Sequence, residues 1–324
     1  MTDFNLGFSI QSFSELKDNW DIIIIGGGPA GLSAALYAAR GKKQTLVLER
    51  NSAPGGQIAT TGIVEDYPGI EHISGPELSQ AWAKHAQKFG AHIVYGVNVE
   101  EINFEQKYVK TSGIMRRTFY YKKLIITTGA IWNELGIKGE KEFRGRGVSY
   151  CAVCDAPFFK NKNVIVVGGG NSALDEALFI ADNFANSVTI VHRRDKFKAD
   201  KILQDRAMAH KKIKIMFNTE LREIKGNETV KSVLLYNNKE NKTFEIPIDA
   251  VFIFIGMIPN TEKFNLKKDE QGYIITDEKM KTSVKDVFAA GDCRRSALKQ
   301  AINAASDGAI AAYFATREID EEKS

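Results

Sequence analysis

The sequence predicts an α/β fold of two Rossmann-like dinucleotide-binding domains, each a parallel sheet with a small antiparallel layer, the second inserted in the first. Three observations predict this fold. Two glycine-rich turns of the same kind occur, a buried strand precedes each turn, and the 324 residues suit about two domains. Two such units in the same order indicate an internal duplication.

The first glycine turn follows a β-branched run at 21–25, which is typical of a buried parallel strand. Three glycines of the pattern G-x-G-x-x-G come next: Gly26, Gly28 and Gly31. The first permits a tight turn, the second lets a pyrophosphate approach the backbone, and the third brings a helix at 34–40 close to the strand. A second strand, 45–48, ends at Glu49, where an acid that binds a ribose hydroxyl is expected. We predict a dinucleotide site; a tight turn in an unrelated α/β fold is the alternative.

The same order of elements recurs further along the chain. A strand at 164–167 precedes a helix through Phe184, and the turn between them has the pattern residues Gly168, Gly170 and Ala173. The next strand, 188–191, ends in a basic group: His192, Arg193 and Arg194, with Lys198 close behind. Guanidinium groups hold a 2′-phosphate that a carboxylate would repel, so this site is predicted to prefer NADPH over NADH. A solvated basic face is the alternative.

The remaining segments predict how the two units are joined. Alternating residues at 91–121 predict an antiparallel layer, and the apolar run that follows predicts a parallel strand returning to the first sheet before Gly129. A strand at 251–255 mirrors it, and a strand at 287–290 leads through Asp292 into a helix at 297–316. The predicted domains are 1–131 and 260–324 as one unit, with 1–20 as an extension, and 132–259 as the insertion.

Composition and charge exclude several classes of protein. A formal net charge of +4 is too small to indicate a nucleic-acid or membrane partner, and no apolar run approaches the roughly 18 residues of a membrane span. Residues 1–20 lack the basic start and long apolar centre of a signal peptide. Only three cysteines occur, which disfavours a secreted disulfide scaffold and leads us to expect the cytoplasm.

Two of the cysteines form the motif Cys151-Ala-Val-Cys154-Asp155. In a Cys-x-x-Cys pair one sulfur can resolve the bond that the other forms, which suits disulfide exchange. The alternative is half of a zinc site, but zinc requires four ligands and no second such pair exists, so no metal is expected. We expect Cys293, the third cysteine, to be a buried structural residue.

With these motifs the chain resembles the low-molecular-weight thioredoxin reductases of bacteria and plants, from about residue 21 to 317. The resemblance also rests on Gly55-Gly-Gln57, Thr128-Gly-Ala130 and Gly291-Asp292. It implies that FAD binds the first domain through residues of several segments: Gly26, Gly28, Pro29, Ala30, Gly31, Glu49, Gly56, Gln57, Asp66, Gly129, Asp292, Gln300 and Ala301. It implies that NADPH binds the inserted domain through Gly168, Gly170, Asn171, Ser172, Ala173, His192, Arg193, Arg194 and Lys198.

Three residues depart from the pattern of that family. Asp66 stands where asparagine is common, and Lys198 and Lys299 each stand where arginine is common. Lysine does not offer the bidentate geometry of arginine, so Lys198 leaves the strictness of the NADPH preference open.

The resemblance also implies the chemistry and the partner. Cys154 would exchange with the flavin, Cys151 would attack the disulfide of thioredoxin, and Asp155 would move the proton; a helix cap is the alternative role for Asp155. The inserted domain would rotate between half-reactions, and the family suggests a homodimer. Thioredoxin would dock near Arg146, Phe158 and Phe159; a core position is the alternative for both phenylalanines, and more so for Phe159.

Two other functions remain as alternatives. A reductase of a peroxide-scavenging system shares this core but adds an N-terminal thioredoxin-like module, for which 20 residues are too few. A nucleotide-sensing regulatory module without enzymatic activity would show no colour change with NADPH.

Overall fold

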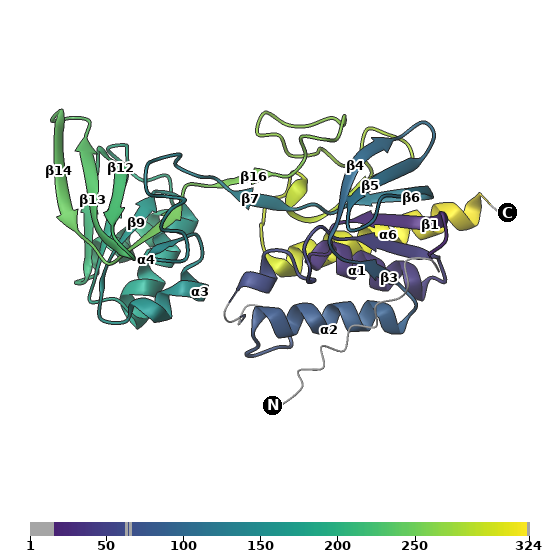
Figure 1. Ribbon diagram of the computed structural model, residues 1–324, viewed down its shortest axis with the longest axis horizontal. Coiled ribbons are helices and arrows are strands. Elements are labelled where there is room, and N and C mark those ends of the chain that lie inside the picture. Colours follow the sequence, from purple (N-terminus) through teal and green to yellow (C-terminus); the bar gives the residue numbers. More distant parts are fainter. Residues whose placement is uncertain (1–15, 62–63, 65–66, 323–324) are drawn as a thin grey trace. The chain divides into compact units, whose positions relative to one another are not determined.

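The computed structural model describes residues 16–61, 64 and 67–322. The chain divides into two compact units (Figure 1). The first is formed by Met1–Thr60, Glu65–Ala130 and Pro259–Ser324, and the second by Thr61–Val64 and Ile131–Ile258.

The first unit is built around one mixed sheet. Its strands are β1 (Asn19–Ile25), β2 (Thr45–Leu48), β3 (His92–Val94), β4 (Val97–Asn103), β5 (Tyr108–Gly113), β6 (Thr118–Ile126) and β17 (Val287–Ala289). Their order is β3-β2-β1-β6-β5-β4, with β17 also paired to β6. The pairs among β1, β2, β3, β6 and β17 are parallel, whereas β4 and β5 extend the sheet antiparallel.

Helices cover one face of this sheet: α1 (Pro29–Arg40), α2 (Gly75–Lys88) and α6 (Ala301–Glu321), with short turns η2 (Ile58–Thr60) and η4 (Gly291–Cys293). Successive β1 side chains point to opposite faces. Ile22 and Ile24 pack with the alanines of α1 and α6, whereas Ile23 and Ile25 enter a second core with residues of β4, β5 and β6. Burial on both faces explains why β1 ends in a run of four isoleucines, Ile22–Ile25.

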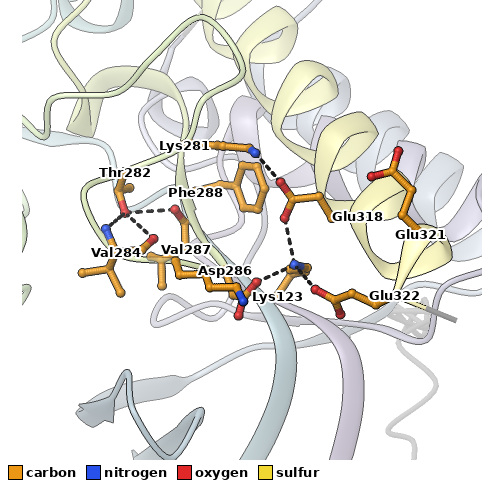
Figure 2. Close-up of a pocket in the computed structure, with 11 residues that line it drawn as sticks. Lys123, Lys281, Thr282, Val284, Asp286, Val287, Phe288, Glu318, Glu321 and Glu322 are labelled. Carbon is orange, nitrogen blue, oxygen red and sulfur yellow. Dashed lines mark hydrogen bonds and ion pairs between the residues drawn. The ribbon is translucent and has the colours of Figure 1, made fainter.

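A buried lysine fastens the last helix to the sheet. Lys123 of β6 is 1% exposed, and its Nζ donates hydrogen bonds to Asp286, to Glu318 at 2.8 Å and to Glu322 at 2.8 Å. These groups line a cavity of about 380 Å³ and point toward one another in Figure 2. Burial alone would lower the pKa of Lys123, but the three carboxylates outweigh it and raise that pKa. The cavity contains none of the predicted site residues, so we assign it to stability.

The second unit repeats the layered plan. Its parallel sheet has the order β11-β10-β9-β15-β8. These strands are β8 (Val148–Ser149), β9 (Asn163–Gly168), β10 (Ser187–Val191), β11 (Ile213–Met216) and β15 (Ala250–Phe254). The antiparallel layer is β12 (Thr219–Gly226), β13 (Val230–Asn237) and β14 (Lys242–Pro247), and the helices are α3 (Ala152–Asp155), η3 (Ala156–Phe159), α4 (Asn171–Asn183) and α5 (Lys201–Ala209).

The side chains of β9 divide as those of β1 do. Val164 and Val166 pack with α4, whereas Ile165 and Val167 pack with the antiparallel layer. The chain passes between the units through β7 (Ala130–Trp132) and β16 (Met257–Pro259), which pair with each other. None of the helices in the described part of the chain combines the length and apolar composition needed to span a bilayer.

Three predicted boundaries were wrong. Strand β1 begins at Asn19 and buries Trp20, both inside the segment assigned to the extension. Strand β6 belongs to both layers, because its antiparallel half pairs with β5 and its buried end pairs with β1. Helix α6 begins at Ala301 and not at residue 297, because Ser296 and Lys299 hold the preceding loop by hydrogen bonds to its own backbone.

Candidate active site

The first glycine turn is closed by contacts that exclude any side chain. Gly26 has φ +108°, and a Cβ atom there would stand 2.4 Å from the carbonyl oxygen of Thr127. A Cβ atom at Gly31 would stand 1.9 Å from the carbonyl oxygen of Gly26. These contacts bring the start of α1 against the end of β1, as the pattern predicts.

The same turn leaves its backbone open at one point. A Cβ atom at Gly28 would meet only the carbonyl oxygen of Gly55, at 3.9 Å. Helix α1 begins at Pro29 without a side-chain cap, and its first turn contains no acid. Unsatisfied N–H groups at an open helix N-terminus attract phosphate, so Gly28, Pro29 and Ala30 fit a pyrophosphate.

Glu49 is buried beside this turn with a fixed orientation. One carboxylate oxygen accepts from the backbone N–H of Gly27 at 2.5 Å, and the other accepts from Asn51 at 2.7 Å. Each oxygen keeps a second lone pair, so the carboxylate can still accept from a ribose hydroxyl.

Two loops lie against the first turn. The N–H of Gly55 donates to the carbonyl of Gly27 at 2.7 Å, and a Cβ atom at Gly56 would stand 3.4 Å from the Cα atom of Gly28. The amide of Gln57 donates to Ala130 at 3.0 Å, next to Gly129. Gly129 itself has φ +64° and nothing within 4 Å of an added Cβ atom, which leaves room for a ligand.

Turn η4 and the start of α6 complete this region. Gly291 lies against Ala30, because a Cβ atom added at Gly291 would stand 2.8 Å from the Cβ of Ala30. The next residue, Asp292, is partly buried, and burial raises the pKa of its carboxyl. Gln300 precedes α6 without making a side-chain cap, and Ala301 is the first helical residue.

A buried ion pair supports this loop, and the sequence reasoning missed it. Asp307 accepts from the N–H of Gly291 at 3.1 Å and pairs with Arg294 at 3.0 Å. The sequence signal that could have indicated this ion pair is an acidic residue, Asp307, among the small residues of the last helix. All the predicted FAD residues that the structure describes belong to the first unit, whereas Asp66 lies outside the described residues.

The second glycine turn has the same closed and open positions. A Cβ atom at Gly168 would stand 2.3 Å from the carbonyl oxygen of Phe254 and 2.6 Å from the Cβ of Ala173. At Gly170 it would meet nothing within 4 Å. Helix α4 begins at Asn171, without a side-chain cap or an acid in its first turn. Asn171 and the exposed Ser172 thus stand at a second open helix N-terminus.

The basic loop is attached to this turn. The N–H of Lys198 donates to the carbonyl of Gly169 at 2.7 Å, and Asn171 exchanges hydrogen bonds with Asp200. The side chains of Arg193, Arg194 and Lys198 are exposed, and none of them pairs with a carboxylate in the described part of the chain.

His192 differs from its basic neighbours. Its ring packs against Phe197 with centroids 5.7 Å apart, and its buried Nε2 has no hydrogen-bond partner among the described residues. Burial lowers the pKa of His192, as do the nearby arginines, so the ring is neutral near pH 7. The positive charge of the basic group therefore comes from Arg193, Arg194 and Lys198, and a contact between His192 and NADPH stays a prediction.

Glu176 of α4 is a titratable group that the sequence reasoning missed. Burial, together with the neighbouring Asp175, raises the pKa of Glu176 to about 7. The partial burial of a helical glutamate follows from the packing of α4 and has no local sequence signal.

The cysteine motif lies at the short helix α3, with Cys151 directly before its first residue, Ala152. Cys151 is disulfide-bonded and partly buried, and its backbone exchanges hydrogen bonds of 3.0 Å with the Ser149 hydroxyl. Asp155 precedes η3, yet its side chain makes no capping hydrogen bond, which removes support from the capping alternative. Cys293 is free, fully buried and bonded to backbone carbonyls, and burial raises its pKa to about 11.

The predicted docking residues separate into two kinds. Phe158 is 79% exposed and Arg146 is also exposed. Phe159 instead packs edge-on against Phe252 of β15, with ring centroids 6.0 Å apart. Phe159 therefore belongs with the core of the second unit.

Comparison with known proteins agrees with this arrangement. Residues 20–308 match the pyridine nucleotide-disulphide oxidoreductase family. A thioredoxin reductase of Listeria innocua is 45% identical over 307 residues, which are 94% of this chain and 95% of the relative. A thioredoxin reductase of Bacillus subtilis is 46% identical over 305 residues, 93% of this chain and 95% of that protein.

Solved structures give the same answer. Lactococcus lactis thioredoxin reductase, in its FR conformation, aligns with a TM-score of 0.79 and 41% identity, covering 93% of this chain and 99% of that one. T. acidophilum thioredoxin reductase aligns with a TM-score of 0.79 and 34% identity, covering 94% of this chain and all of that one (100%). This chain therefore belongs to the pyridine nucleotide-disulphide oxidoreductase family and, within it, to the low-molecular-weight thioredoxin reductases, oxidoreductases that use FAD and NADPH.

Proposed function

We propose that this chain is a thioredoxin-disulfide reductase that passes electrons from NADPH through FAD and a Cys151–Cys154 disulfide to thioredoxin. The observation that carries the proposal is the disulfide-bonded Cys151 in the same unit as an open glycine turn, whose nearby Arg193, Arg194 and Lys198 pair with no carboxylate among the described residues. FAD, when bound, supplies a two-electron relay between the nicotinamide and the disulfide. The roles of the individual residues below are part of the proposal.

Each nucleotide site positions one end of the relay. Gly28, Glu49 and Asp292 would hold the pyrophosphate, adenosine ribose and ribityl chain of FAD. Arg193 and Arg194 would hold the 2′-phosphate of NADPH, since charge-assisted hydrogen bonds favour a dianion. Lys198 would add a third cation.

The cysteines carry out the exchange with the protein substrate. Starting from the reduced Cys151–Cys154 pair, the thiolate of Cys151 would attack the thioredoxin disulfide, form a mixed disulfide, and expel one thioredoxin sulfur, to which Asp155 would supply a proton. Cys154 then attacks the sulfur of Cys151, restores the internal disulfide and releases the second thioredoxin sulfur. The overall balance is NADPH, one proton and one thioredoxin disulfide, giving NADP⁺ and two thiols.

We also propose that the inserted domain, 132–259, rotates between the two half-reactions. Two glycines with positive φ, Gly129 and Gly256, flank the paired connections β7 and β16, and among the described residues no atom beyond the chain neighbours lies within 4 Å of a Cβ added at either. Such positions absorb backbone rotation without steric cost. A homodimer in the cytoplasm is the proposed working form, and sedimentation of the purified holoenzyme tests the dimer.

One anaerobic titration tests the function. NADPH should bleach the flavin absorbance of the purified protein, and oxidised thioredoxin should restore it. Cys151→Ser should still be bleached by NADPH but not restored by thioredoxin, whereas Cys293→Ala, a matched control in a buried position, should complete the cycle. Thioredoxin turnover by Cys151→Ser would contradict the cysteine mechanism.

A further inference from the structure

Lys299 closes the loop that leads into α6. Its Nζ donates to the carbonyl of Asp292 at 3.1 Å and to the carbonyl of Arg294 at 2.7 Å. The same ammonium lies 4.0 Å from the centroid of the Tyr273 ring, which is a cation–π contact. One partly buried charge thus joins three points of the chain.

The rest of the loop is anchored independently of this lysine. The carbonyl of Cys293 accepts from Ile274 at 3.0 Å, and Arg295 donates to the carbonyl of Ile274 at 2.8 Å. Asp307 holds Gly291 from the side of α6. Removing the Lys299 charge should therefore loosen the placement of Asp292 and of the helix start without unfolding the loop.

Some groups around Lys299 stabilise its protonated form, and others destabilise it. Asp292 and Asp307 attract the ammonium, Arg294 repels it, and the Cys293 thiol and the Tyr273 ring face the same region. Burial is the largest effect and lowers the pKa of Lys299. A neutral amine gives weaker hydrogen bonds to carbonyls and no cation–π attraction.

We propose that protonated Lys299 is a positioning residue that holds Asp292 and the start of α6 in the arrangement that retains FAD, and that deprotonation of Lys299 weakens this retention. The inference rests on the proposed function, in which Asp292, Gln300 and Ala301 contact FAD. An arginine at this position would stay charged at any accessible pH, so it would not show the alkaline loss.

The test measures FAD release from the holoenzyme by flavin fluorescence in the filtrate, between about pH 7 and about pH 10. Wild type should lose affinity for FAD by about tenfold over this range, the loss expected for one charge-assisted contact. Lys299→Arg should show no such loss, and Lys299→Met should bind weakly at every pH. Lys279→Met is the matched control, because Lys279 also lies over an aromatic ring, Phe314, outside the candidate site.

Each outcome separates the two proposals. A wild-type profile that is flat, or that matches Lys299→Arg, overturns the role of Lys299, as does normal FAD retention by Lys299→Met. If the circular dichroism of Lys299→Met is not native, the test rests on the pH dependence of FAD affinity in wild type compared with that in Lys299→Arg. A wild-type protein that contains no flavin at neutral pH overturns the proposed function itself.

Discussion

The imidazole of His192 lies against Gly169, so close that a Cβ atom added at Gly169 would stand 2.3 Å from Nδ1. Gly169 is not one of the pattern residues of this turn, which are Gly168, Gly170 and Ala173. Its identity is decided by a ring that belongs to the end of β10, because no side chain fits between the turn and that ring. The adjacent Gly170 has open space and a different reason to be glycine.

We predict that Gly169→Ala and Gly170→Ala fail in different ways. Gly169→Ala should displace His192 and cost about 1–3 kcal/mol of unfolding free energy, the usual cost of overpacking. Gly170→Ala should leave the thermal midpoint unchanged and weaken NADPH binding, since its methyl group would enter the phosphate position. Thermal melts and NADPH titrations measure both; a melting loss in Gly170→Ala would contradict the open position.

The NADPH preference should reside in the two arginines. Replacing Arg193 and Arg194 together by glutamine should raise KM for NADPH by one to two decades, since a charge-assisted phosphate contact contributes roughly 1.5–3 kcal/mol. KM for NADH should hardly change, because NADH lacks the 2′-phosphate. Equal rates of flavin reduction by the two nucleotides in the wild type would refute the prediction. Lys231→Gln, an exposed lysine elsewhere in the second unit, serves as the charge control.

Substitution of Phe158 should affect thioredoxin binding, whereas substitution of its neighbour Phe159 should affect stability. Phe158→Ala should raise KM for thioredoxin about tenfold, as for a hot-spot residue that contributes roughly 1–2 kcal/mol, and should leave reduction of a small disulfide dye unchanged. Phe159→Ala should instead lower the thermal midpoint, because its ring packs on Phe252. A parallel fall of dye and thioredoxin activity in Phe158→Ala would remove the residue from the docking surface.

Glu176 should make the protein less stable at alkaline pH. Its pKa, about 7, is raised above the unfolded value, so the folded state favours the protonated form. The stability that this provides is complete below the unfolded pKa of about 4.5 and is lost as pH rises through about 7. Glu176→Gln should therefore raise the free energy of unfolding by about 1–3 kcal/mol at pH 8 and hardly change it at pH 4.5. Urea unfolding at both pH values measures this, and Asp175→Asn should give a smaller gain of the same sign.

Lys123 should matter for stability and not for catalysis. Lys123→Met removes the lysine shared by three carboxylates, although Lys107 still pairs with Asp286 and Lys281 with Glu318, so we expect a loss of about 1.5–3 kcal/mol of unfolding free energy near neutral pH. The pKa values of Asp286 and Glu318 are lowered in the folded state, where hydrogen bonds to lysines outweigh burial, so their contribution is lost as pH falls below about 4. The difference between variant and wild type should therefore narrow in acid. Unchanged stability at pH 7 would contradict the assignment of this cluster.

Much of this protein could be read from short-range patterns. The strand, turn and helix around Gly26–Gly31 and around Gly168–Ala173 follow from local stereochemistry, because a tight turn and a close helix require glycine at fixed spacings. The absence of an acid after β10 and the spacing of Cys151 and Cys154 are likewise visible in the sequence. These features need no distant partner, so the sequence by itself determined them.

Tertiary structure decided the features whose partners are far apart in the chain. A lysine in β6 is buried where Asp286, Glu318 and Glu322 reach it, and α6 starts at Ala301 where Ser296 and Lys299 hold the loop before it. Phe158 and Phe159 have identical side chains, yet only the position of Phe252 makes one of them core. Local patterns specify what each backbone segment can adopt, whereas the burial and the charge of a side chain depend on which distant residues the fold brings to it.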